Sequence, residues 1–281
     1  MQKVTSPKEF QSLCWSWRGL GQSVALVPTM GYLHAGHLSL FQWARENAQK
    51  VAVSVFVNPT QFGPNEDLSR YPRDVEGDTA KATAAGVDVL FMPRPQDLYP
   101  QGFSTTVSVA GLTQGLCGAS RPGHFDGVAT VVAKLLMLAM PTIAIFGQKD
   151  WQQLAVLRRM VQDMHFPLAI EGRPIFREPD GLAMSSRNVY LSPAERAQAP
   201  AIHQGLVQAR EAVLAGETDA ARLLASLAEF YGANMPDAHA DYLELVHPET
   251  LTPLRTVTGP ALLAVAVKFP KARLIDNMLL Q

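Results

Sequence analysis

Short apolar runs alternate with helix-like segments through the first 174 residues, and this alternation constrains the fold more than any other feature. Strands are predicted at 24–28, 51–57, 87–92, 143–146 and 167–171, with helices at 5–20, 37–49, 74–85, 126–139 and 151–164. Strand–helix–strand order favours parallel pairs joined by right-handed crossovers. We therefore expect an α/β domain over residues 1–174, with a Rossmann-like, doubly wound parallel sheet.

The alternation stops near residue 175. A turn-rich stretch at 177–188 precedes Ser192-Pro-Ala-Glu195, a capping box that predicts the start of a long helix. A second helix is expected at about 219–231, and strands at 241–246 and 261–267 indicate a small antiparallel sheet. We therefore predict a smaller α+β domain over residues 175–281. One further short strand is expected in the first domain, at 105–109.

Composition excludes several classes of protein. Apolar residues make up 47% of the chain and charged residues 17%, enough to build a substantial core. The net charge of −1 argues against a nucleic-acid-binding protein. Cys14 and Cys117 offer neither a metal-binding spacing nor a disulfide framework, which fits a reducing cytoplasm. The N-terminal residues lack a signal-peptide core and the apolar runs are short, so we expect a cytoplasmic protein without a membrane span.

The first candidate site is the strand–turn–helix segment Val24–Leu40. Glycines at 31 and 36 flank His34, and His37 follows at the start of the predicted helix. The free N–H groups and positive dipole end of a helix start favour an anion, so this segment indicates a phosphate site. Two other interpretations stay open: a metal shared by the two histidines, or histidines that only cap and pack. The nearby sequence offers no third metal ligand.

The second candidate is Gly147-Gln-Lys-Asp-Trp-Gln-Gln153, where a predicted strand ends and a helix begins. Asp150 is a good N-cap, and Lys149 lies where open α/β sheets bind ligands and would neutralise phosphate oxygens. Gln153 would point toward the same crevice from the first helical turn. The alternative is that both side chains are solvated surface residues.

The third candidate is the loop Gly181–Asn188, which contains Met184, Ser185, Ser186 and Arg187. Two hydroxyls and a guanidinium suit phosphate oxygens, although an ordinary serine-rich turn has the same composition. No serine-nucleophile elbow, Walker loop or dinucleotide glycine motif occurs in the sequence.

Three other groups have less specific patterns. Arg121 and His124 either reach the site or cap the following helix, whereas Asp126 is expected to cap it. Asp78 and its acidic neighbours either hold Mg²⁺ or favour the first turn of a helix. The segment 58–73, which contains Gln61, has the composition of a binding loop or lid.

Taken together, the chain resembles the pantoate–β-alanine ligase family almost from end to end. The resemblance is carried by five segments: Pro28-Thr-Met-Gly-Tyr-Leu-His-Ala-Gly-His37, Phe56-Val-Asn-Pro-Thr-Gln-Phe62, Asp67-Leu-Ser-Arg-Tyr-Pro-Arg73, Phe146-Gly-Gln-Lys-Asp-Trp-Gln-Gln153 and Asp180-Gly-Leu-Ala-Met-Ser-Ser-Arg-Asn188. The His-x-Gly-His element alone is shared with a broad nucleotidylyltransferase superfamily. All five segments in this order are far more specific.

The resemblance implies a two-step, ATP-dependent reaction. Pantoate attacks the α-phosphate of ATP to give pantoyl adenylate and diphosphate, and β-alanine then displaces AMP to give pantothenate. It also implies Mg²⁺ bound with ATP, no organic prosthetic group, and a homodimer. Residues 58–73 would form a gate over the adenylate, and the domain 175–281 would act as a lid.

Site residues are carried over by position. His37 would be the proton donor, acting with His34 and Lys149 in catalysis. Gln61 and Gln153 would bind pantoate, and Gln61 would also border the β-alanine site. The residues implied to bind ATP are Met30, Gly31, His34, Gly36, His37, Gly147, Gln148, Lys149, Asp150, Phe176, Met184, Ser185, Ser186 and Arg187.

The chain departs from the family in two places. Gln148 stands where relatives commonly have Glu, which removes a charge beside Lys149. At the positions where some relatives bind Mg²⁺ through acids and a Gln, the chain has Gly77, Asp78 and Lys81, so only Asp78 would be a ligand.

Two alternatives to the ligase function are less consistent with the sequence. A nucleotidylyltransferase acting on a phosphorylated acceptor is disfavoured by Gln61 and Gln153, which suit a small hydroxy acid better than a phosphate. A non-catalytic nucleotide-binding protein is disfavoured because the complete phosphate-binding set, from His37 to Arg187, is retained.

Overall fold

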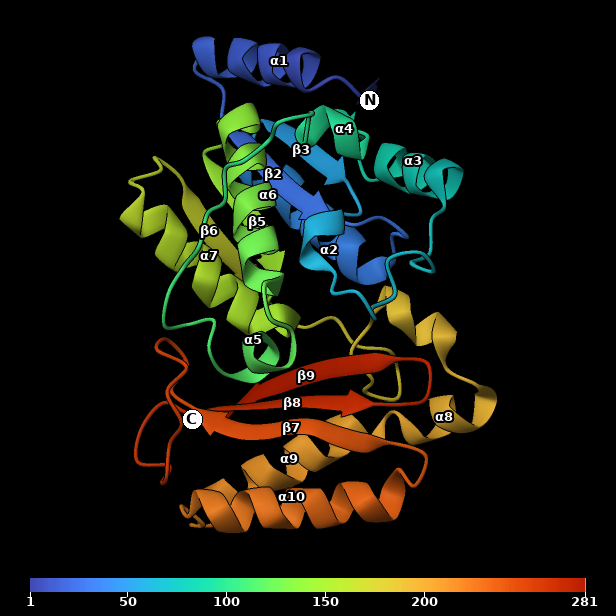
Figure 1. Cartoon of the computed structure of the whole chain (residues 1–281), viewed down its shortest axis with the longest axis vertical. Coiled ribbons are helices and arrows are strands. Elements are labelled where there is room, and N and C mark those ends of the chain that lie inside the picture. Colours follow the sequence, from blue (N-terminus) through green and yellow to red (C-terminus); the bar gives the residue numbers. More distant parts are fainter. Residues whose placement is uncertain (281) are drawn as a thin grey trace. The chain divides into compact units, whose positions relative to one another are not determined.

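The computed structural model describes residues 1–280, which divide into two compact units. The first unit contains Met1–Ala110, Arg121–Gln148 and Val156–Pro174. The second contains Gly111–Ser120, Lys149–Ala155 and the residues from Ile175 onward. Figure 1 shows the elements of both units in sequence colours. Within residues 1–280, no helix has the length and apolar character required to cross a membrane.

The first unit is built on a six-stranded sheet. Its strands are β1 (Gln2–Val4), β2 (Val24–Thr29), β3 (Lys50–Val55), β4 (Val89–Phe91), β5 (Ile143–Gly147) and β6 (Ala169–Arg173), in the order β1-β4-β3-β2-β5-β6. All neighbours are parallel. The chain proceeds from β2 through β3 to β4 on one side and from β5 to β6 on the other. The predicted doubly wound sheet is confirmed, and its switch point lies between β2 and β5.

Helices cover this sheet and bury its central strands. They are α1 (Pro7–Gly19), α2 (Ala35–Asn47), α3 (Val75–Ala84), α4 (Pro95–Leu98), α6 (His124–Ala139) and α7 (Trp151–Asp163), with 3-10 turns η1 (Pro59–Gln61) and η2 (Gln148–Asp150). Helix α2 packs Leu40, Phe41 and Ala44 into a core with residues of β2 and β3. Helices α1 and α6 also contact β2, so this strand is almost entirely buried.

The second unit contains a three-stranded antiparallel sheet and helices. The strands are β7 (His239–Val246), β8 (Leu262–Lys268) and β9 (Arg273–Leu279), in that order. The helices are α5 (Leu116–Ser120), α8 (Pro193–Gln198), α9 (Ala201–Leu214) and α10 (Ala220–Asn234), with the 3-10 turn η3 (Ser186–Tyr190). Helices α9 and α10 pack together, with α9 contacting β9 and α10 contacting β7. The predicted α+β architecture of this region is confirmed.

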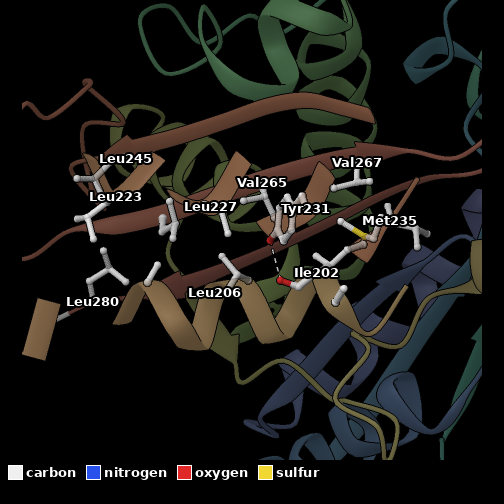
Figure 2. Packing of buried hydrophobic residues seen from close by; sticks show 14 of the residues in the cluster. Ile202, Leu206, Leu223, Leu227, Tyr231, Met235, Leu245, Val265, Val267 and Leu280 are labelled. Atoms are coloured by element: carbon white, nitrogen blue, oxygen red, sulfur yellow. Dashed lines mark hydrogen bonds between the residues drawn. The ribbon is translucent and has the colours of Figure 1, made fainter. Parts of the chain in front are cut away.

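The core of the second unit lies between these helices and the sheet. Figure 2 shows Ile202 and Leu206 from α9 packed among side chains of α10 and β8. The Tyr231 hydroxyl, drawn in this close-up, donates a 2.7 Å hydrogen bond to the carbonyl of Ile202. The hydroxyl is therefore satisfied inside an otherwise apolar cluster.

Three secondary-structure predictions were wrong. Residues 105–109 form no strand, because the Val107 N–H donates to the Thr130 hydroxyl on α6 (2.9 Å) instead of to a neighbouring strand. The capping box at Ser192 is present, but the helix after it ends at Gln198, and α9 starts at Ala201 after Pro200, which has no N–H to donate. Helix α6 starts at His124 after Gly123 (φ +79°), so Asp126 lies inside the first turn and is not the cap.

Other elements were missed by the sequence reading. Strand β9 contains Asp276 and Asn277, which interrupt its apolar pattern, yet both are buried. Asp276 pairs with Arg177, and Asn277 donates to the carbonyl of Lys149, so each polar group has a partner. Strand β1 and the short helices α4 and α5 are too brief to give a period in the sequence.

Two leucines of α9 provide a matched test of the core of the second unit. Leu206 is 0% exposed and Leu214, in the same helix, is 75% exposed. We expect Leu206→Ala to lower the free energy of unfolding by about 2–5 kcal/mol through lost burial and a cavity. Leu214→Ala should change it by less than about 0.5 kcal/mol. Urea denaturation followed by circular dichroism measures both, and equal losses would contradict this packing.

Candidate functional site

The turn between β2 and α2 has a strained backbone at the switch point of the sheet. Gly31 (φ +83°) and Tyr32 (φ +52°) both adopt left-handed conformations, which is unusual for tyrosine. A Cβ on Gly31 would lie 2.9 Å from an Asp78 oxygen and 2.9 Å from Val55. Glycine is therefore required here to let the turn approach Asp78.

Asp78 on α3 fixes this turn. Its side chain is 1% exposed, and its two oxygens accept hydrogen bonds from the backbone N–H groups of Tyr32 (2.8 Å) and Leu33 (2.6 Å). One turn further along α3, Lys81 donates to the Leu33 carbonyl (2.9 Å). Hydrogen bonds to a buried carboxylate are among the stronger ones in proteins. Helix α3 therefore holds both polar groups of Leu33 and the strained residue before it.

The two histidines lie directly after this turn. His34 is the N-cap residue of α2, with extended backbone (φ −131°, ψ 174°), and His37 lies in the first turn. Their ring centroids are 4.0 Å apart, and the His34 N–H donates to Nδ1 of His37 (3.3 Å). Because Nδ1 of His37 accepts, the proton of the neutral ring is on Nε2. The Nε2–H of His37 is therefore a hydrogen-bond donor in the first turn of α2.

Gln61 is brought next to this turn although it lies thirty residues further along the chain. Its amide donates to the Met30 sulfur (3.3 Å), and its Oε1 accepts from the amide of Asn58 (3.0 Å). Asn58 is buried, and its amide also donates to the carbonyl of Gly127 on α6 (3.1 Å). The side chains of Met30 and Gln61, assigned to different substrates by the resemblance, are thus adjacent.

The end of β5 completes the predicted residues of the first unit. Gly147 is the last residue of β5, which pairs with β2 on one side and β6 on the other. Gln148 donates to the carbonyl of Gly172 on β6 (3.2 Å). The uncharged side chain at this position therefore ties the end of β5 to the edge strand. Gly36 is the second residue of α2, and its carbonyl accepts from the Ser39 hydroxyl (2.9 Å).

The remaining predicted residues belong to the second unit. The Lys149 ammonium donates to the carbonyl of Met184 (3.4 Å), and its own carbonyl accepts from Asn277 on β9 (2.9 Å). The Met184 N–H donates to the carbonyl of Phe176 (2.9 Å), whose side chain is exposed. The structure thus connects Lys149 to the loop that the sequence proposed for phosphate.

Burial lowers the pKa of the Lys149 ammonium. The charge of Asp150 opposes this shift, Arg187 adds to it, and Asp276 opposes it more weakly. A partly desolvated ammonium lacks the water that would stabilise its charge. It therefore gains more from a bound polyphosphate than an exposed lysine does.

The loop before η3 is held by buried polar contacts. Arg177 forms a two-point ion pair with Asp276 on β9, at 2.6 and 3.0 Å. The Ser185 hydroxyl caps η3 by accepting from the Arg187 N–H (3.2 Å), and Ser186 is buried. The loop Met184–Arg187 therefore has a defined conformation, in which the Ser185 hydroxyl already has a backbone partner.

The two glutamines near the start of α7 differ in their surroundings. Gln152 is buried, accepts from the Cys117 N–H (2.9 Å), and donates to the carbonyls of Leu112 (2.8 Å) and Gly115 (2.9 Å). Gln153 is half-buried on the next face of the helix. The sequence alone did not show which of the two adjacent glutamines is buried, and the assignment of Gln153 to pantoate stays a prediction.

The structure gives the predicted metal ligand a different role. Both oxygens of Asp78 already accept backbone N–H groups, and within residues 1–280 no group of three His, Cys, Asp or Glu side chains is placed to hold a metal. The residues present do not fit a protein-bound Mg²⁺ at Asp78. Asp78 instead holds the backbone of the turn before α2.

Sequence reasoning missed several residues that shape this region. Asn58 and Gly127 position Gln61, and Lys81 supports the histidine turn. A Cβ on Gly127 would overlap the Thr60 carbonyl and lie 2.7 Å from the Gln61 nitrogen. The available signals were weak: an Asn-Pro pair directly after a strand, and a glycine inside an apolar helix, which often marks a close backbone approach.

The first unit therefore has an α/β fold with an imidazole pair and a helix start at the switch point of a parallel sheet, an arrangement that suits a phosphate. Residues 2–279 match the family model described as Pantoate-beta-alanine ligase. The chain belongs to this family.

Curated and solved relatives agree with this assignment. The pantothenate synthetase of Oleidesulfovibrio alaskensis is 60% identical over 280 residues, covering 100% of both chains. A crystal structure of the enzyme from Thermus thermophilus is 50% identical, with a TM-score of 0.95 over 100% of this chain and 99% of that one. The Francisella tularensis ligase, solved with beta-gamma ATP and β-alanine, is 33% identical, with a TM-score of 0.84 over 100% and 98%. The chain is thus a ligase of pantothenate biosynthesis.

The role of Asp78 can be tested by a conservative change. In Asp78→Asn, an amide NH₂ would face one of the two backbone N–H groups, and we expect unfolding to become easier by about 1–3 kcal/mol. The matched control is Glu76→Gln, an exposed position on the same helix, with a change below about 0.5 kcal/mol. Thermal denaturation with and without Mg²⁺ provides the measurement. Unchanged stability combined with an altered Mg²⁺ requirement would restore the metal assignment.

Proposed function

We propose that this chain joins pantoate to β-alanine in an ATP-dependent reaction that passes through pantoyl adenylate. The observation that carries the proposal is the pair of imidazoles held at the start of α2, with Gln61 against Met30 beside them. This arrangement combines groups suited to phosphate with an amide suited to a small hydroxy acid. The Francisella tularensis relative, crystallised with beta-gamma ATP and β-alanine, supports the choice of substrates.

In the first step, a pantoate carboxylate oxygen bonds to the α-phosphorus of ATP, and the bond to the leaving diphosphate breaks. Negative charge grows on the phosphate oxygens as this occurs. The Nε2–H of His37 would donate to these oxygens, with His34 and the N–H groups of the helix start adding positive potential. Gln61 would hold the hydroxy acid in line for attack, assisted by Gln153.

In the second step, the β-alanine amine bonds to the acyl carbon, and AMP leaves with the electron pair of the broken anhydride bond. The attacking nitrogen loses a proton, so the products are pantothenate and AMP. Gln61 would border the amine site because it already borders the acyl group. Segment 58–73 would exclude water, since the mixed anhydride is readily hydrolysed.

The second unit would supply charge to the leaving diphosphate. Lys149 is connected to the loop Met184–Arg187 through the Met184 carbonyl, and Ser185, Ser186 and Arg187 follow in that loop. The backbone at Phe176 would contact adenine, and Gly147 would contact the nucleotide. Mg²⁺ held by the ATP phosphates and water would neutralise part of the phosphate charge. A lid role for residues 175–281, a homodimer and a cytoplasmic location stay predictions.

The reaction itself tests the proposal. The purified protein is incubated with ATP, Mg²⁺, pantoate and β-alanine, and AMP, diphosphate and pantothenate are measured. We expect AMP and pantothenate in equal amounts, and no sustained AMP release when β-alanine is omitted. AMP that is independent of β-alanine, or transfer of the nucleotide to a phosphorylated acceptor, would favour the nucleotidylyltransferase alternative and overturn the ligase.

Lys149 predicts a specific pH dependence. Burial lowers the pKa of the free lysine from 10.5, and bound polyphosphate would raise it again. ATP binding should therefore take up protons between these two pKa values, so affinity falls as pH rises through the lower one. Lys149→Arg should remove this alkaline loss because arginine stays charged. Calorimetry in buffers of different ionisation enthalpy measures the proton uptake. Identical pH profiles of ATP affinity for the wild type and Lys149→Arg would exclude this role of Lys149.

A further inference from the structure

A cluster of charged and polar groups lies behind Gln61, at the start of α6. His124 Nδ1 is 2.8 Å from the Gln61 carbonyl, and Arg121 donates to the same oxygen (3.3 Å). Arg121 also forms two hydrogen bonds of 2.6 Å with Glu66, from Nε and from one terminal nitrogen. We call these three residues the Glu66–Arg121–His124 cluster. It lies entirely in the first unit.

The contacts determine the protonation of His124. A carbonyl oxygen only accepts, so Nδ1 of His124 must donate to Gln61. The guanidinium of Arg121, 3.0 Å from Nε2, only donates, so Nε2 must accept. The ring is therefore neutral, with its proton on Nδ1. Both polar atoms of the imidazole have a fixed role in holding the Gln61 backbone.

Glu66 connects the cluster to the middle of segment 58–73. Its side chain is 25% exposed and that of Arg121 16%, so the ion pair is largely shielded from water. Burial raises the pKa of the Glu66 carboxyl, but the hydrogen bond and charge of Arg121, together with smaller contributions that include a hydrogen bond from the Gly63 backbone, lower it overall. The Glu66 N–H also donates to the Gly63 carbonyl (3.1 Å). Charge-assisted, two-point contacts of this kind fix geometry well.

Other groups restrain Gln61 from the opposite direction. Asn58 holds its Oε1, and the absence of a side chain at Gly127 lets the Thr60–Gln61 backbone lie directly on α6. The Gln61 amide is thus positioned from its side chain by Asn58 and from its carbonyl by the cluster. A substrate-binding group gains most when its neighbours hold it before the substrate arrives.

We propose that Glu66, Arg121 and His124 are positioning residues for the hydroxy-acid substrate, acting through the backbone carbonyl of Gln61. The inference builds on the proposed function, in which Gln61 binds pantoate. Loss of the cluster should weaken pantoate binding and slow its attack on ATP, while leaving ATP binding nearly unchanged. The groups assigned to ATP phosphate are different side chains: His34 and His37 at the start of α2, and Lys149 of the second unit.

An alternative role for Arg121 predicts the opposite change in KM for pantoate when Glu66 is replaced. If Arg121 bound a substrate carboxylate directly, Glu66 would compete with that substrate. Glu66→Gln would then free the guanidinium and lower KM. In a positioning role, Glu66→Gln loosens Arg121 and raises KM. The direction of a single change therefore separates the two roles.

The test compares Glu66→Gln, His124→Leu and His124→Asn in steady-state kinetics, with each substrate varied in turn. We expect Glu66→Gln and His124→Leu to lower kcat/KM for pantoate by about ten- to hundredfold, with KM for ATP within about twofold of wild type. His124→Asn places an amide donor near the position of Nδ1 and should recover much of the loss. The control is Arg159→Gln, which breaks the exposed Arg159–Asp163 pair on α7 and should behave as wild type.

The outcomes separate this inference from the function beneath it. Thermal denaturation shows which variants are folded. If His124→Leu does not fold, the kinetics of Glu66→Gln still test the positioning role. An active wild type with unchanged Glu66→Gln kinetics, equal losses for ATP and pantoate, or a lowered KM for pantoate would overturn the positioning role alone. A wild type that forms no pantothenate would overturn the proposed function together with this inference.

Discussion

The buried carboxylate of Asp78 is the interaction on which the phosphate-binding region depends. It accepts two backbone N–H groups from a turn in which Gly31 and Tyr32 are both left-handed, a conformation that tyrosine adopts only when its surroundings enforce it. This turn determines where α2 begins, and therefore where His34 and His37 lie. One side chain on α3 therefore determines where the imidazoles lie relative to the sheet.

The architecture was predictable because burial leaves a clear pattern of apolar residues in the sequence. Continuous apolar runs such as 51–57 identified strands buried on both faces, and the order of elements fixed a parallel sheet with helices on each side. Where polar contacts replaced apolar ones, the reasoning failed. Strand β9 was missed because Asp276 and Asn277 are buried with partners far away in sequence, and 105–109 was assigned a strand although its N–H bonds to a side chain on α6.

In the candidate site, too, some residues could be predicted from the sequence and others could not. The residue types at His34, His37 and Lys149 indicated phosphate because their chemistry is local to a helix start or a strand end. The role of Asp78 was not visible, since a carboxylate in the first turn of a helix has the same sequence pattern whether it binds a metal, faces solvent or accepts a distant backbone N–H. Asn58, Glu66 and Gly127 act across separations of tens of residues, which a single sequence does not encode locally.

The path of the chain between the two compact units has a consequence for how the protein can be divided. The chain passes from one unit to the other after residues 110, 120, 148, 155 and 174, and α7 begins in one unit and ends in the other. A cut at 174 would leave Lys149, with its contacts to Met184 and Asn277, on the wrong fragment. The chain therefore crosses between the units several times. A gene fragment that begins at residue 175 would lack Leu116, Trp151 and Ala155, which pack in one hydrophobic cluster of the second unit.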